Sequence, residues 1–280
     1  MARSLAADLL HAVLPSDCRI CGDPMLGLRP VRVCDACIRR VAERVQSPNE
    51  LCERCGDALG MESARFAASL GMRECTGCRI NPPSFTRAVA FGPYDNELRE
   101  MLHAFKFSGV RRVGKGVLGG WIAAALLALE GEAAATLLVV PVPLFEQRQR
   151  ERGYNQAELL ARAAVRRMRR LRPAWQMELR TDLLQRVRDT RAMFQLRPDQ
   201  RRRNLQGAFR VSRKDVVGGR EILLIDDILT TGATANQCAK ALLKAGATRV
   251  WVATVARAQP ESRLTITQDV ARWDAGGVGV

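Results

Sequence analysis

Residues 221–235, EILLIDDILTTGATA, decide the fold of this chain. Residues 222–225 are an apolar run long enough for a buried strand. Two acids follow at once, and apolar residues recur at helical spacing from Ala235 to Lys244. The stretch therefore predicts a strand, an acid pair, a loop of small residues and a helix, in that order. The acids and the loop are Asp226, Asp227, Thr230, Thr231, Gly232, Ala233 and Thr234.

This order of elements suits a sugar phosphate. In a parallel sheet, ligands bind where strands end and helices begin. The start of a helix offers a phosphate unpaired backbone N–H groups and the positive end of the helix dipole, and Gly232 lets the backbone come close. The two carboxylates would repel a phosphate but can accept hydrogen bonds from the hydroxyls of its sugar. The residues thus indicate a ribose 5-phosphate site; the alternative is a solvated acid pair before a threonine helix cap.

The stretch resembles the phosphoribosyl pyrophosphate (PRPP) motif of type I phosphoribosyltransferases. The resemblance implies that Asp226 and Asp227 bind the 2- and 3-hydroxyls of ribose. It also implies that the loop from Thr230 to Thr234 binds the 5-phosphate. A P-loop is excluded because no Gly-Lys-Ser/Thr follows, and a dinucleotide-binding fingerprint is excluded because GxGxxG is missing.

Eight of the nine cysteines form four Cys-x-x-Cys pairs. Two such pairs complete a closed tetrahedral site, so the spacing predicts two structural Zn²⁺ ions. The glycines that follow two of the pairs, Gly22 and Gly56, suit the turn of a zinc knuckle. Disulfides and a redox motif are the alternatives, and Cys238 is predicted to pack in the core. We expect sequential pairing, with interleaved pairing left open: Cys18, Cys21, Cys34 and Cys37 on one ion, and Cys52, Cys55, Cys75 and Cys78 on the other.

The composition is strongly basic. The formal net charge is +15, and only five of the 44 basic residues are lysines, so 39 are arginines. This balance favours nucleic acid or another anionic partner, although a general preference for arginine would give the same charge. No stretch has the 18 or more apolar residues of a membrane helix. Because Asp8 and His11 interrupt the apolar N-terminal segment, we expect a short amphipathic helix there rather than a signal peptide, and a cytoplasmic protein without membrane insertion.

Strand and helix patterns alternate after Pro82 and Pro83. Strands are expected near 88–91, 137–142, 222–226 and 249–256, with helices over 96–107, up to about 129, and over 156–170. This alternation predicts an α/β fold with a parallel sheet flanked by helices. The expected domains are a zinc-binding double-knuckle module at 1–83, a phosphoribosyltransferase-like domain at 84–258 and a loose tail at 259–280.

Arginines follow the strand predicted at 137–142. Arg148 and Arg152 are expected in a loop at the same sheet edge as the acid pair, where they and Lys106 are candidates for binding pyrophosphate. Residues 156–170 are an amphipathic helix whose outer face bears Arg162, Arg166, Arg169 and Arg170. A solvated helix face accounts for these four arginines as well as an anion site does.

The motifs together resemble the ComF family of competence-associated proteins. The resemblance rests on the cysteine knuckles, Lys106-Phe107, PVPL at 141–144, Arg148-x-x-x-Arg152-Gly-Tyr-Asn-Gln, the PRPP-like loop, and Arg203, Asn204, Ala208 and Phe209. It covers nearly the whole chain to about Arg257. One segment departs from the family pattern: residues 188–195 read RDTRAMFQ where the family usually has a Thr-Pro-x-Gln-like segment. No role in base or acceptor binding is therefore assigned to it.

The resemblance implies a PRPP-binding protein, with Mg²⁺ on the pyrophosphate, that handles single-stranded DNA during natural transformation. Two other functions remain open at this stage. The first is a nucleobase phosphoribosyltransferase of nucleotide salvage, which the acid pair and loop alone would allow. The second is a non-catalytic adaptor whose zinc module docks a partner such as the competence helicase or translocase. The catalytic residues and the acceptor are not predicted.

Overall fold

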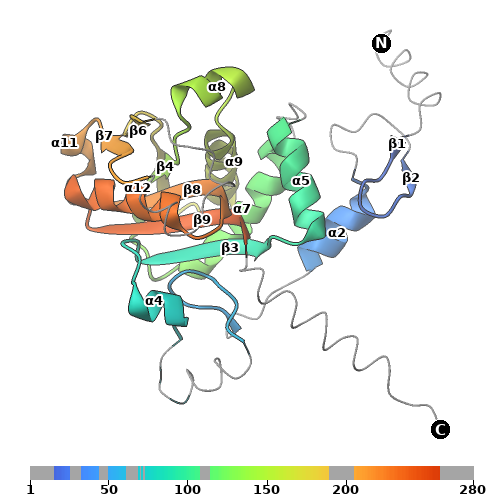
Figure 1. Cartoon of the computed structure of the whole chain (residues 1–280), viewed down its shortest axis with the longest axis horizontal. Helices are drawn as coiled ribbons and strands as arrows, with labels where there is room; N and C mark the ends of the chain where they lie inside the picture. The colour runs from blue at the N-terminus through green and yellow to red at the C-terminus, as the bar shows by residue number, and fades with distance from the viewer. Residues whose placement is uncertain are drawn as a thin grey trace.

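The computed structural model describes residues 16–25, 33–43, 50–60, 69, 71, 73–107, 114–188 and 205–258. Its centre is a five-stranded sheet with the strand order β3-β9-β8-β4-β5, in which every neighbouring pair is parallel (Figure 1). The strands are β3 (Arg87–Pro93), β4 (Thr136–Pro141), β5 (Gln176–Leu179), β8 (Glu221–Leu229) and β9 (Arg249–Arg257). The predicted α/β class with a parallel sheet flanked by helices is confirmed.

The middle strand β8 extends further than predicted. The sequence suggested a strand of 222–226 that ends at the acids, but β8 continues through Asp226 and Asp227 to Leu229. The reason is pairing with β9, which is equally long and matches Asp226 with Thr254 and Leu229 with Arg257. The first five residues of β8 are buried, as expected of a strand covered on both faces.

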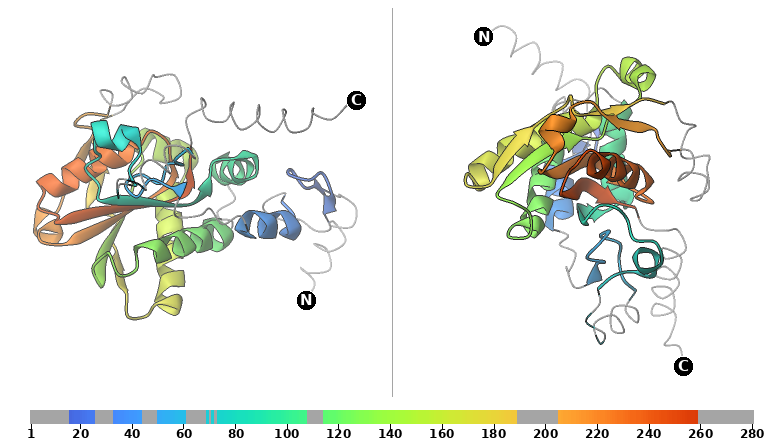
Figure 2. Two further views of the ribbon diagram at one scale, coloured as in Figure 1. Left: turned by 90° about the horizontal axis from the view of Figure 1, so that it is seen from below. Right: turned by 90° about the vertical axis from the view of Figure 1, so that its left-hand side faces the viewer.

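Helices cover both faces of the sheet (Figures 1 and 2). One face packs against α5 (Asn96–Phe107), α7 (Gly119–Leu126) and α9 (Gln156–Leu171) through Leu223 and Ile225 of β8. The other face packs through Ile222 and Leu224 against α12 (Ala233–Lys244). The alternation of apolar side chains along a buried strand therefore supplies two separate cores.

The chain reverses its direction across the sheet between β4 and β8. From β4 it runs outward to β5 through α9 on one face, and from β8 it runs the opposite way to β9 through α12 on the other face. A crevice at such a switch point is where open α/β sheets bind ligands, at the carboxyl ends of the strands. The acids of the central strand lie at this edge.

Several other segments also differ from the sequence predictions. Residues 146–152, expected as a loop, form α8 (Glu146–Arg152). The edge strand β5 was not expected, and neither were the antiparallel strands β6 (Leu184–Arg186) and β7 (Phe209–Val211) or the short helix α11 (Lys214–Val217). The helix expected to reach about 129 is divided into η2 (Gly114–Leu118), α7 and η3 (Leu127–Leu129).

The two cysteine groups pack in different cores. The first, with β1 (Ser16–Asp17), β2 (Pro24–Met25) and α2 (Asp35–Glu43), joins the core of α5, α7 and α9. The second, with α4 (Thr76–Ile80), joins the core of α12. Figure 1 shows α2, β1 and β2 on the far side of α5 from the sheet, and α4 below β3. The predicted domain limits at 83 and 258 remain predictions, and the N-terminal helix and the tail lie outside the described residues.

Among the described residues, every helix is too short or too polar to cross a lipid bilayer.

Glu221 anchors the amino end of the central strand. Its side chain is 9% exposed; Oε1 accepts a hydrogen bond from Arg249 Nε at 2.7 Å, and Oε2 accepts from Trp251 Nε1 at 2.8 Å and from Ala134 N at 3.0 Å. Burial alone would raise the pKa of Glu221, but these donors outweigh it and lower the pKa below its ordinary value. The ionised carboxylate therefore ties β8 to β9 and to the residues before β4.

We predict that Glu221→Gln lowers the free energy of unfolding by about 2 kcal/mol at pH 7, because one of the three donors loses its acceptor. The loss should shrink as the pH falls below about 4.3, because the carboxylate of the unfolded chain protonates first, and it should be smallest once the native carboxylate, whose pKa is lower, has also protonated. Urea unfolding of both proteins at pH 7 and under acid measures this difference. Glu178→Gln, which removes an exposed carboxylate near Arg180 and Arg220, should change stability by less than about 1 kcal/mol. An equal effect of both substitutions would contradict the prediction.

Candidate functional site

The loop after β8 turns sharply at Gly232 into the helix that follows. Gly232 has φ +73°, a left-handed conformation that favours glycine, and it directly precedes α12. The N–H of Asn236 donates to Gly232 O at 2.8 Å, and the N–H of Ala233 donates to Thr231 Oγ1 at 3.4 Å. The twelve-residue helix α12 thus begins one residue after the turn, with its positive dipole end at the loop.

The acid pair interrupts the regular pattern of β8. Both carboxylates are half-buried, and Asp226 Oδ1 accepts a hydrogen bond from the N–H of Asp227 at 2.9 Å. Ile225 and Ile228, three residues apart, both pack toward the core of α7 and α9. Strict alternation would place them on opposite faces, so the strand changes its orientation at the acids. The acids lie where the strand leaves the buried part of the sheet.

Arg186, at the end of β6, brings a positive charge to the side of the sheet on which α12 lies. The thiol of Cys238 on α12 is fully buried, as predicted from the sequence, and burial raises its pKa far above the ordinary value. The charge of Asp226 raises this pKa further, and the charge of Arg186 opposes the rise. The charges of Asp226 and Arg186 thus both act on this buried thiol, and the sequence did not single out Arg186.

The pyrophosphate candidates Arg148 and Arg152 lie on α8 instead of the predicted loop. They are four residues apart, which places them on one helix face, and both are half-buried, whereas Arg150 is exposed. Since α8 follows β4 and β4 pairs with β8, this helix lies after the strand next to the acids. The side chain of Lys106, on α5, lies outside what the structure describes.

A second arginine that the sequence did not single out donates hydrogen bonds to the loop after β8. Arg257, the last residue of β9, is 8% exposed and donates to the carbonyl oxygens of Leu229 at 3.1 Å and of Thr230. It also donates to Cys55 O at 3.0 Å, and its Nη2 lies 3.7 Å from Asp57 Oδ1. One buried guanidinium thus joins the loop after β8 to the second cysteine group.

A cavity of about 430 Å³ lies between the second cysteine group, which contains Cys55, and the loop after β8. Its walls combine apolar side chains with amides and the buried ion pair, and Phe85 lies 3.8 Å from the position where a Cβ on Gly232 would stand. Asn236 Oδ1 accepts from the N–H of Ser84 at 2.7 Å and fixes one wall. Residues that line the cavity include Asp57, Asn81, Phe85, Thr231, Asn236 and Arg257.

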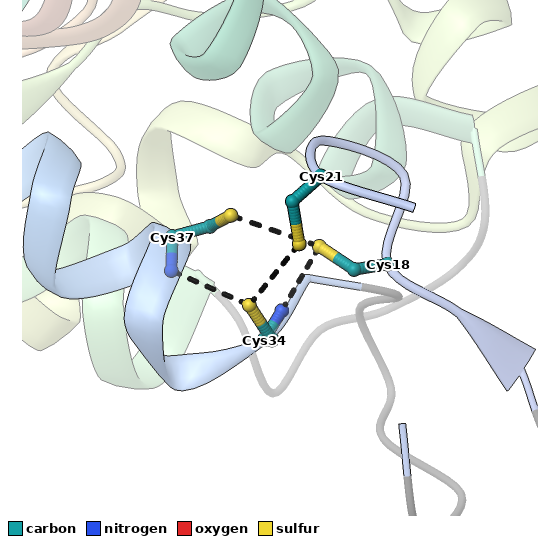
Figure 3. Close-up of side chains that lie close together, drawn as sticks. All are labelled: Cys18, Cys21, Cys34 and Cys37. Carbon is teal, nitrogen blue, oxygen red and sulfur yellow. Dashed lines mark hydrogen bonds between the residues drawn. The ribbon is translucent and has the colours of Figure 1, made fainter. Parts of the chain in front are cut away.

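The first cysteine group is compact, with its four sulfurs within 4.8 Å of one another. Figure 3 shows the four side chains pointing toward a common centre. Burial raises the pKa of Cys18, but backbone N–H groups, chiefly those of Cys21 and Cys34, outweigh it and lower the pKa to about 6. Gly22, at φ +75°, forms the knuckle turn that the sequence predicted. The group consists of Cys18, Cys21, Cys34 and Cys37.

The second cysteine group is more deeply buried and is attached to the sheet. Its turn residue Gly56 has φ +65°, and a Cβ there would stand 3.2 Å from Ala88 O of β3, so both the turn and the close packing favour glycine. The N–H of Ala88 in turn donates to Arg54 O at 2.9 Å. The four sulfurs again lie within 4.8 Å of one another: Cys52, Cys55, Cys75 and Cys78.

The donor chemistry of both groups fits Zn²⁺. Four thiol sulfurs around one point match a closed tetrahedral site, and the structure groups the cysteines in the sequential order expected from the spacing. The nearest sulfurs of different pairs are 3.7 Å apart in both groups, far longer than a disulfide bond, and all nine cysteines are free thiols. Structural metal binding is therefore the chemistry that these side chains support.

No protein-family model matches the chain. A curated relative from Escherichia coli K12, DNA utilization protein YhgH, is 30% identical over 246 residues, which cover 85% of this chain and 96% of the relative. Competence protein F of Haemophilus influenzae is 30% identical, over 74% of this chain and 84% of its own length. Competence protein ComFC of Bacillus subtilis is 27% identical, over 55% of this chain and 56% of its own.

Among solved structures, TT1426 from Thermus thermophilus is similar over 52% of this chain and 84% of its own, with 19% identity and a TM-score of 0.29. A score this low carries no argument, so the sequence relatives decide the assignment. Two of them reach 30% identity over most of both chains, and they bear the competence and DNA-utilization names that the motif resemblance implied. The chain belongs to the ComF family.

Proposed function

We propose that this protein binds PRPP at the carboxyl end of β8 and acts as a phosphoribosyltransferase-type protein in the use of DNA taken up by the cell. The observation that carries the proposal is the meeting of an acid pair and a glycine turn at the start of a helix, at the switch point of the sheet. A phosphate-binding turn beside two hydrogen-bond acceptors matches ribose 5-phosphate and no simpler anion.

Each part of PRPP has a group suited to it. The carboxylates of Asp226 and Asp227 accept hydrogen bonds from the ribose hydroxyls, and the backbone N–H groups of the loop, with its threonine hydroxyls, bind the 5-phosphate. Arg148 and Arg152, on one face of α8, are assigned to the pyrophosphate, together with Lys106. Mg²⁺ would accompany the pyrophosphate and neutralise part of its charge.

The reaction that suits such a site is transfer of the ribosyl group from PRPP with release of pyrophosphate. The protein's contribution is to hold the ribose by its hydroxyls and its phosphate, so that C1 faces the acceptor in a fixed orientation. The acceptor itself is left open. The segment 188–195, which departs from the family pattern, lies almost wholly outside the described residues.

The role with DNA is supported by the relatives and by the charge. Relatives that cover most of the chain are named for DNA utilization and competence. The net charge of +15, carried mainly by arginine, suits a polyanionic partner. A cytoplasmic location, where thiols stay reduced, agrees with nine free cysteines.

We predict that Asp226→Asn with Asp227→Asn weakens PRPP binding by about 100-fold, because two charged acceptors of the ribose hydroxyls are removed. Isothermal titration with PRPP and Mg²⁺ measures the change. Asparagine retains a side-chain oxygen, so the bond from the N–H of residue 227 can persist and the fold should survive. Asp215→Asn removes a charge from an exposed pair with Arg213 and should leave binding unchanged. Unaltered affinity in the double variant would refute the assignment of the ribose site.

We predict two zinc ions per chain, one for each cysteine group. Elemental analysis of the purified protein should give a stoichiometry of two, and Cys18→Ser with Cys21→Ser should retain one ion. Cys52→Ser with Cys55→Ser should also retain one. Loss of both ions in the first variant, with a correctly folded sheet, would show that the groups are not independent.

We predict that Arg257→Gln lowers the free energy of unfolding by about 3 kcal/mol, because several buried carbonyl oxygens and Asp57 lose their cationic partner. PRPP affinity should fall in parallel, since the loop after β8 is no longer held. Thermal unfolding and PRPP titration check the two effects. Arg220→Gln, at a partly exposed pair with Glu178, is the matched control and should change neither. A folded Arg257→Gln protein with normal PRPP affinity would contradict the positioning role.

A further inference from the structure

Another cavity, lined by three arginines, lies where α9 meets the start of α7, and it shares no residue with the PRPP motif. It has a volume of about 600 Å³. One wall is the second half of α9, and the other is η2 and the first turn of α7. It is lined by Gly116, Val117, Gly120, Trp121, Ala163, Arg166, Arg167 and Arg170. We call it the α9 groove.

The three arginines of the α9 groove differ in their ion pairing from Arg162 on the same helix and from Arg172 at its end. Arg162 pairs with Glu158 at 2.7 Å, and Arg172, at the helix end, pairs with Glu130 at 2.7 Å. Within the described ranges, no carboxylate pairs with the three arginines that line the groove. Arg169 is likewise exposed without a carboxylate partner among the described residues, but it lies outside the groove, so the groove is distinguished by three such arginines that line one cavity. Their positive charge is therefore available to a ligand.

The opposite wall of the α9 groove is open backbone. A Cβ at Gly116 or at Gly120 would meet no atom within 4 Å, so the two glycines leave space on the side facing the arginines. Trp121 below them is 7% exposed and stacks in parallel on Phe91, with ring centroids 4.6 Å apart. Phe91 covers one face of this ring and the side chain as a whole is nearly buried, so the groove offers little aromatic surface on which a base could stack.

We propose that the α9 groove binds the phosphodiester backbone of single-stranded DNA. Arginine forks match phosphate oxygens in a bidentate geometry, and the series Arg166, Arg167 and Arg170 offers successive contacts along one strand. A flexible single strand can lay its backbone into a cavity of this size, whereas a duplex presents its phosphates on a broad convex surface. Contacts to phosphates are independent of base sequence, because the backbone is the same for every nucleotide.

This inference adds a second site to the proposed function and does not depend on PRPP. None of the residues that line the α9 groove belongs to the acid pair, the phosphate loop or α8. The groove would hold the DNA strand while the PRPP site binds its own ligand. Loss of one site should therefore leave the other intact, and the two proposals can fail separately.

The test compares two triple variants of the full-length protein. Arg166→Gln/Arg167→Gln/Arg170→Gln removes the charges that line the groove. Arg162→Gln/Arg169→Gln/Arg172→Gln removes three charges from the same helix and its end, outside the groove. Both lower the net charge equally, and glutamine is as good a helix former as arginine. The probe is a fluorescently labelled oligothymidylate, whose anisotropy is followed across a salt series.

For the groove variant we expect the slope of log affinity against log salt to become shallower by about 2, as it should when three phosphates of a single strand are no longer neutralised. Its affinity at low salt should fall at least about tenfold, and the control variant should stay within about threefold of the wild type. PRPP titration should be unchanged in both. Equal losses of affinity in the two variants, or no binding of oligothymidylate by the wild type at low salt, would overturn the proposal.

Competition experiments distinguish single-stranded DNA from duplex DNA and from polyphosphate as the ligand of the groove. Unlabelled single-stranded oligonucleotide should displace the probe from the wild type more effectively than a duplex of equal length. Inorganic polyphosphate, matched in charge, should compete more weakly than the single strand. If polyphosphate or duplex displaces the probe better than the single strand does, the groove is a general polyanion site and the assignment to single-stranded DNA is wrong.

Discussion

The buried guanidinium of Arg257 is the interaction on which the candidate site most depends. It stands at the carboxyl end of β9, donates to backbone oxygens of the loop after β8 and to Cys55 O, and faces Asp57. A buried cation is stable only when its donors are satisfied, and here the acceptors come from segments that lie far apart in sequence. The hydrogen bonds of Arg257 therefore fix the loop after β8 and the second cysteine group relative to each other.

The central part of the fold could be predicted because its signals are local. The apolar run before Asp226 could be buried only as a strand, and Gly232 followed by helical periodicity predicted the turn and α12. Cysteine spacing likewise identified both metal groups and their sequential order, because two thiols of a Cys-x-x-Cys pair lie on one turn. In each case, the geometry is set within a few residues and does not require knowledge of the rest of the chain.

The features that were missed or wrong depend on tertiary contacts. Residues 146–152 form a separate helix that ends at the left-handed Gly153, and Asn155 then caps α9. The many charged residues of this segment gave no apolar pattern from which the helix could be predicted. The strand β8 passes the acids because β9 pairs with it to Leu229. Arg186 and Arg257 resemble the many other arginines of the chain in sequence, and only their surroundings in the fold distinguish them. Their roles follow from neighbours that no local pattern specifies.

The two cysteine groups lie in short segments that pack against the central domain. Short segments such as 16–25 and 50–60 bury little apolar surface of their own, so tetrahedral metal binding would supply the free energy that orders them. The first group extends the core beside α5, at a distance in sequence from the acids. The second lies between β3 and the loop after β8, where Ala88 N–H donates to Arg54 O and Cys55 O accepts from Arg257. Metal binding at the second group would therefore stabilise the wall of the ligand site, whereas metal binding at the first would stabilise only the scaffold.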